Sequence, residues 1–91
     1  MQAALVPEQL RFGINQLDTE AARTDRNAIP ELGKLICNKY LKLVSPSSVF
    51  YEMKVAFVSP AASEPHRKSI FFLFNELCRC CKCEEEFIRD A

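Results

Sequence analysis

The sequence predicts an all-α fold, in which four or five short helices form a single domain over residues 1–91. Three observations lead to this prediction. Only 2 glycines and 5 prolines occur, too few for the many tight turns of an all-β domain. Apolar residues recur every three to four positions, as on one face of a helix. The chain is 48% hydrophobic and 26% charged, which is typical of a folded globular domain.

The first predicted helix covers residues 7–17. Leu10, Ile14 and Leu17 follow helical spacing, and Pro7 suits a first helical turn. Residues 18–27 are polar and alternate in charge. They fit an extension of this helix as well as a linker, so the sequence leaves both alternatives open.

The second predicted helix covers residues 29–43. Asn27 is its expected N-cap, and Pro30 is tolerated in its first turn. Its apolar stripe consists of Ile29, Leu32, Ile36, Tyr40 and Leu43. We expect this stripe to face the core.

The third predicted helix covers residues 49–58. A Ser-Pro-Ser-Ser segment precedes it, and Ser47 or Ser48 is its expected N-cap. One side of this helix carries Val49, Phe50, Met53 and Phe57. Residues 59–65 are rich in Pro, Ser and Ala and predict a loop.

The fourth predicted helix covers residues 67–83, with its end at Lys82 or Cys83. At least half of its circumference is expected to be buried, because apolar side chains recur with helical period at Ile70, Leu73, Phe74, Leu77, Cys78 and Cys81. Residues 84–91 predict the start of a fifth helix, with three glutamates near its N-terminus.

Charge and hydropathy restrict the classes of partner. The 12 basic and 12 acidic side chains cancel, which argues against a dominant grip on nucleic acid, since such binding needs a basic surface. No apolar run approaches the roughly 18 residues of a membrane span. The N-terminus lacks the basic and apolar regions of a signal peptide. We therefore expect a location in the nucleus or the cytoplasm, where thiols stay reduced.

The cysteines do not predict a metal centre or a nucleophile. Four of the five cysteines lie between residues 78 and 83, where helical spacing spreads their sulfur atoms around one helix. The interpretation is therefore partly buried free thiols without a metal or another cofactor. His66, the only histidine, is expected on a surface loop, and no base is paired with a nucleophile. The sequence thus predicts a binding protein rather than an enzyme.

Two polar residues interrupt the apolar run of the fourth helix. Asn75 and Glu76 either face solvent on an amphipathic helix or offer donors and acceptors to an extended peptide. The surrounding sequence, RKSIFFLFNELCRCCKCEEEF, resembles the fourth helix of CTD-interacting domains, which bind the tail of RNA polymerase II. The matching positions are Arg67, Lys68, Phe72, Leu73, Asn75, Glu76 and Leu77.

The resemblance implies a fold and a function. The fold would be the N-terminal part of a right-handed superhelix, most similar to the regulation-of-nuclear-pre-mRNA proteins. The function would be peptide binding in transcription termination or pre-mRNA 3′-end processing, in the nucleus. The related VHS and ENTH domains of membrane traffic carry a shorter version of the pattern. A cytoplasmic adaptor module is therefore the alternative.

The resemblance also implies a binding surface along the second and fourth predicted helices. Its residues would be Phe72, Asn75, Glu76 and Arg79, with Lys39 and Lys42 placed to attract phosphate. Two positions depart from the family pattern: its tyrosine is Phe72 here, and a later asparagine falls at Cys80. A structural subunit that has lost its ligand is thus another alternative. An incomplete superhelix would expose apolar surface, which favours a completing partner chain or a homodimer.

Overall fold

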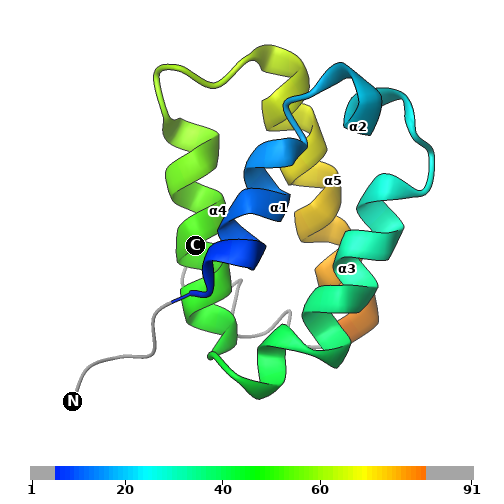
Figure 1. The fold of residues 1–91 in the computed structure, drawn as a ribbon. Helices are drawn as coiled ribbons and strands as arrows, with labels where there is room; N and C mark the ends of the chain where they lie inside the picture. The colour runs from blue at the N-terminus through cyan, green and yellow to red at the C-terminus, as the bar shows by residue number, and fades with distance from the viewer. Residues whose placement is uncertain (1–5, 82–91) are drawn as a thin grey trace.

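The computed structural model describes residues 6–81 (Figure 1). Its helices are α1 (Glu8–Gln16), α2 (Glu20–Thr24), α3 (Ala28–Asn38), the 3-10 helix η1 (Tyr40–Lys42), α4 (Pro46–Val58) and α5 (Glu64–Cys81). Residues 6–81 contain no strand, which confirms the all-α prediction. The right-handed superhelical arrangement stays a prediction. The fifth helix predicted at 84–91, and the predicted helix end at Lys82 or Cys83, lie outside the described residues.

The N-terminal part of the chain forms two helices. Leu10 and Ile14 of α1, and Leu17 directly after it, are buried as their spacing predicts. The polar segment that follows is neither a simple extension nor a linker, because it contains the separate short helix α2. Thr19 caps α2: its side-chain oxygen accepts a hydrogen bond from the Ala22 N–H at 3.1 Å.

The second predicted helix is shorter than its apolar stripe indicates. α3 ends at Asn38, and the chain continues through η1. A 3-10 helix has three residues per turn, so the stripe changes phase after Tyr40. Tyr40 and Val44 are therefore buried, whereas Leu43, predicted to face the core, is 60% exposed.

The N-cap of α4 is Ser45, and the prediction of Ser47 or Ser48 was wrong. The Ser45 hydroxyl oxygen accepts a hydrogen bond from the Ser48 N–H at 3.2 Å, and Pro46 occupies the first turn. Proline fits there because a first-turn N–H has no partner within the helix. Along α4, Val49 and Met53 are buried as predicted.

The predicted inward side of α4 is only partly correct. Phe50 is partly buried and packs edge-to-face on Phe74 of α5, with ring centroids 5.4 Å apart. Phe57, predicted on the same side, is 38% exposed, and the partly buried Ala56 packs against the core instead. The buried face of α4 is therefore centred on Val49, Met53 and Ala56, and Phe57 lies at its edge.

Helix α5 begins earlier than predicted, at Glu64. Ser63 precedes it, and its hydroxyl oxygen accepts a hydrogen bond from the His66 N–H at 3.1 Å. The same hydroxyl donates to Asp18 Oδ1 at 2.7 Å, which ties the start of α5 to the segment between α1 and α2. His66 therefore lies inside the helix and not on a surface loop, and only 5% of its surface is exposed.

The core lies where α5 meets the other helices. In Figure 1, α5 passes between α4 and α3, with α1 in front of it, and it packs most extensively against α3. The largest fully buried side chains are Leu10, Ile14, Ile36, Val49, Leu73 and Leu77. Within residues 6–81, no helix has the length and apolar character needed to cross a membrane.

Candidate functional site

The outer face of α5 carries the predicted peptide-binding residues. Leu73 and Leu77 are buried, so the 100° step per residue turns Phe72, Asn75 and Arg79 outward. All three are exposed on one face of the helix. We call Phe72, Asn75, Glu76 and Arg79 the α5 row. The row offers an aromatic ring, a side-chain amide and a guanidinium group to a ligand.

Glu76 occupies a different environment from the rest of the α5 row. Its side chain is only 22% exposed, and its Oε1 lies 3.7 Å from Nη1 of Arg79 one turn later. The side chain also packs against Gly33 of α3, where an added Cβ atom would lie 2.8 Å from Glu76 Cγ. Glu76 therefore forms the edge of the row where α5 meets α3, and its carboxylate is held beside Arg79.

Phe71 extends this surface, although sequence reasoning did not assign it a role. Phe71 and Phe72 are 54% and 55% exposed, and their ring centroids are 6.3 Å apart at an angle of 57°. Two large apolar rings side by side in water form an apolar patch of the kind that binds partners. The pair of adjacent phenylalanines in the sequence was the available signal.

The two predicted phosphate-attracting lysines lie on another element. Lys39 follows the end of α3, and its Nζ sits 5.4 Å from the centroid of the Tyr40 ring. Lys42 is in η1, and both lysines are exposed. Within residues 6–81, no hydrogen bond or ion pair joins either lysine to the α5 row. The structure keeps both cations accessible without bringing them into contact with the row.

Arg67, which matches the basic position of the family pattern, makes contacts within the fold and does not lie free on the surface. Its Nε donates a hydrogen bond to the Phe57 carbonyl oxygen at 2.9 Å, and its Nη2 donates to that of Ser59 at 3.1 Å. The Phe57 carbonyl lies in the last turn of α4, where no helical N–H can reach it, whereas the Ser59 carbonyl also accepts a hydrogen bond from the Ala62 N–H at 3.0 Å. Its Nη1 also lies 3.9 Å from Glu64 Oε1. Arg67 therefore joins α4 to α5.

The cysteine prediction needs correction. Cys37 on α3 is disulfide-bonded, whereas free thiols were expected throughout. Cys78 packs, partly buried, against the core. Among residues 6–81, no group of three His, Cys, Asp or Glu side chains is arranged to hold a metal ion. Sequence reasoning missed the disulfide because spacing along a helix says nothing about a cysteine on another helix.

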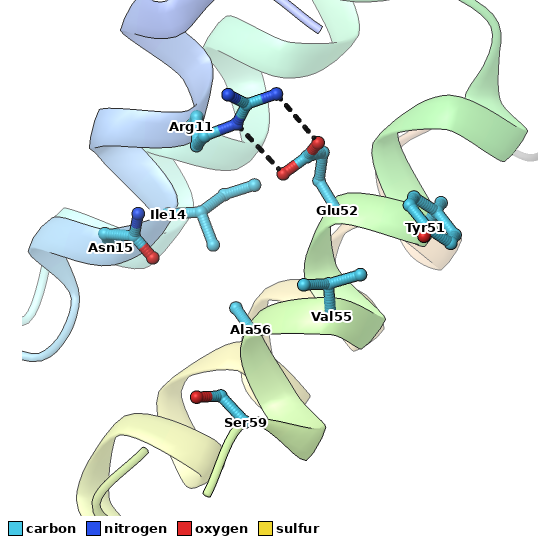
Figure 2. Close-up of a pocket in the computed structure, with 8 residues that line it drawn as sticks. All are labelled: Arg11, Ile14, Asn15, Tyr51, Glu52, Val55, Ala56 and Ser59. Atoms are coloured by element: carbon cyan, nitrogen blue, oxygen red, sulfur yellow. Dashed lines mark hydrogen bonds and ion pairs between the residues drawn. The ribbon is translucent and has the colours of Figure 1, made fainter. Parts of the chain in front are cut away.

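A groove between α1 and α4 is another feature that sequence reasoning missed (Figure 2). It has a volume of about 390 Å³, and its lining residues are Arg11, Ile14, Asn15, Tyr51, Glu52, Val55, Ala56 and Ser59. Arg11 Nε and Nη2 donate to the two carboxylate oxygens of Glu52 at 3.2 and 3.1 Å. The pKa of Arg11 is raised above its ordinary value, mainly by the hydrogen bond to Glu52 and also by the negative charge of Glu52.

Comparison with known proteins gives no relative for this chain. No family model, no curated protein and no solved structure matches it. Function has therefore to be argued from the residues and their arrangement.

Proposed function

We propose that this chain is a peptide-binding module that resembles a CTD-interacting domain. Its ligand is an extended peptide, such as the tail of RNA polymerase II, which lies along the α5 row beside α3. The module acts in transcription termination or pre-mRNA 3′-end processing, in the nucleus. The observation that carries this proposal is the joint exposure of Phe72, Asn75 and Arg79 on one face of α5.

The chemistry of this face suits a peptide. Asn75 can both donate to and accept from a peptide backbone, because its side-chain amide has two N–H groups and one carbonyl oxygen. Phe71 and Phe72 supply apolar contact area for side chains of the ligand. A few residues of this kind can carry most of the binding energy of an interface.

The test is an NMR titration with a peptide of the polymerase-tail heptad repeat. We expect amide shift changes on α5 and α3. Acidic-dileucine peptides and phosphoinositide headgroups are titrated in parallel. Shifts with these ligands alone would favour the alternative, a membrane-traffic adaptor resembling VHS and ENTH domains. No shifts in any titration would favour a structural subunit that has lost its ligand.

Variants separate binding from folding in this titration. Asn75→Ala should weaken peptide binding roughly tenfold, because a peptide group in the complex loses its hydrogen-bond partner. Asn15→Ala is the matched control, since Asn15 is an exposed asparagine on α1, away from the α5 row. Equal affinities of the two variants would contradict the assignment of Asn75 to the binding surface.

A further inference from the structure

Helix α4 is apolar on two opposite faces, although it lies at the surface of the domain. Its inner face packs Val49 and Met53 into the core. On its outer face, Tyr51, Val55 and Val58 follow one another at helical spacing and form one stripe, which we call the α4 ridge. The exposed fractions of these three residues are 67%, 45% and 62%. A helix that is apolar all round is normally buried all round, which indicates that a partner covers the α4 ridge.

The groove between α1 and α4 lies directly beside the α4 ridge, since Tyr51 and Val55 belong to both. Figure 2 shows Arg11 and Glu52 toward one end of the groove and Ser59 toward the other. The groove volume of about 390 Å³ is large enough for an aromatic ring. This face therefore carries a ridge next to a groove. It is complementary to a second copy of itself, because a two-fold rotation places the ridge of each copy against the groove of the other.

The charges of this face also suit a second copy. Arg11 and Glu52 pair within one chain, through hydrogen bonds of 3.2 and 3.1 Å, so the groove presents no net charge to a partner. Lys54, at the edge of the ridge, is exposed, and its long side chain can keep the ammonium group in water. The whole chain has a formal net charge of zero, so no long-range repulsion opposes the approach of two copies.

We propose that this chain forms a symmetric dimer through the α4 ridge and the groove beside it. The two α4 helices run in opposite directions about a two-fold axis near Val55, so Val55 of each copy meets Val55 of the other. Tyr51 of each copy then packs against Val58 of the other and enters the groove at its Ser59 end. There Asn15 and Ser59 supply hydrogen-bonding partners for the phenol group. The α5 row lies on another helix, so peptide binding does not depend on the dimer.

Sedimentation equilibrium tests the dimer. The ridge and the groove lining form a smaller face than the roughly 20–30 residues per partner of a standard interface, so we expect a weak dimer with a dissociation constant of about 100 µM. The average mass should rise from one chain toward two between about 10 µM and 1 mM protein. A mass of one chain throughout would overturn the proposal and leave the ridge to another partner. Non-reducing electrophoresis detects a dimer joined by a disulfide, which would contradict the proposal as well.

Charged variants at residue 55 test the symmetry. Val55→Lys and Val55→Glu should each associate at least tenfold more weakly than wild type, because two like charges would face each other across the axis. An equal mixture of the two variants should associate again, since unlike charges then meet. Val55 is 45% exposed, so both variants should stay folded, as thermal melts would show. Unchanged self-association of either variant, or a mixture that stays monomeric, would overturn the symmetric arrangement.

Tyr51→Lys and Phe72→Lys form a matched pair, because both replace exposed aromatic rings, at 67% and 55% exposure, on different helices. Tyr51→Lys should weaken the dimer at least tenfold, whereas Phe72→Lys should dimerise like wild type. Equal losses in the two variants would show that any exposed ring promotes association, and would overturn the assignment to the α4 ridge. Val55→Lys should bind the heptad peptide like wild type, so failure of peptide binding and failure of dimerisation remain separate results.

Discussion

Glu76 on α5 packs against Gly33 on α3 so closely that a Cβ atom at residue 33 would lie 2.8 Å from Glu76 Cγ. Real Cβ atoms do not approach so near, and the next atom toward the backbone, Glu76 Cβ, would be only 3.6 Å away. Glycine at residue 33 therefore sets the distance between the two helices. The same contact fixes the position of the Glu76 carboxylate beside Arg79.

Gly33→Ala should lower the free energy of unfolding by about 1–2 kcal/mol, because the added methyl group overpacks the α3–α5 contact. Alanine is otherwise the better helix former by about 1 kcal/mol. The same substitution in a Glu76→Ala background should therefore be neutral or stabilising. Urea unfolding of the wild type, both single variants and the double variant measures this coupling. A Gly33→Ala cost that is unchanged in the Glu76→Ala background would contradict the contact.

Leu77→Ala and Asn75→Ala should differ sharply in stability, although they lie two residues apart. Leu77 is almost fully buried, and its truncation should cost about 2–5 kcal/mol, a large part of the stability of a small domain. Asn75 is exposed, and its alanine variant should stay within about 0.5 kcal/mol of wild type. Thermal melts measure both. If Asn75→Ala melts as early as Leu77→Ala, Asn75 is a structural residue and its assignment to the α5 row is wrong.

Arg67→Ala should destabilise the fold by about 1–3 kcal/mol, because the Phe57 carbonyl oxygen loses its side-chain donor and the Ser59 carbonyl oxygen keeps only the Ala62 N–H. Arg67→Lys should restore only part of this loss, since one ammonium group does not reproduce the planar fork of arginine. Lys68→Ala, at the exposed neighbouring position, is the control and should stay within about 0.5 kcal/mol of wild type. Denaturant unfolding measures the free energies of unfolding of the three variants. Equal stabilities would show that the two hydrogen bonds contribute nothing.

Ser45→Ala should cost about 1 kcal/mol, the usual value for loss of an N-cap. Ser47→Ala removes a hydroxyl of the same kind from the first turn of α4, and among the described residues this hydroxyl accepts no hydrogen bond from a backbone N–H. It should therefore be close to neutral. Differential scanning calorimetry on the two variants measures the difference. A larger loss of stability for Ser47→Ala than for Ser45→Ala would show that Ser47, and not Ser45, is the N-cap of α4.

Local patterns predicted the helices well where the chain keeps a single helical period. Leu10, Ile14, Leu73 and Leu77 are buried as their spacing requires. The prediction was wrong where the period changed, at η1, because a 3-10 turn moves every later side chain by a fraction of a turn. The Ser45 cap could have been found, since a proline in the next position is a local signal.

Contacts between distant segments account for the remaining differences. Nothing near Cys37 in the sequence indicates a disulfide, because disulfide formation depends on a second cysteine that the fold brings close. The burial of His66 follows from an earlier start of α5, tied by Ser63 to Asp18, 45 residues away. For the candidate site, helical spacing predicted the exposure of Asn75, whereas Arg79 was placed on the surface by the resemblance to CTD-interacting domains. Helical spacing did not predict the partial burial of Glu76, which depends on Gly33.

The opposite environments of the two tyrosines give this protein a built-in pair of optical reporters. The chain has no tryptophan, so Tyr40 and Tyr51 dominate its intrinsic fluorescence. Tyr40 is buried at 4% exposure, whereas Tyr51 is 67% exposed and lines the groove between α1 and α4. In Tyr51→Phe the remaining emission follows the core through unfolding. In Tyr40→Phe it reports on the groove, so the two variants follow unfolding and occupation of the groove separately.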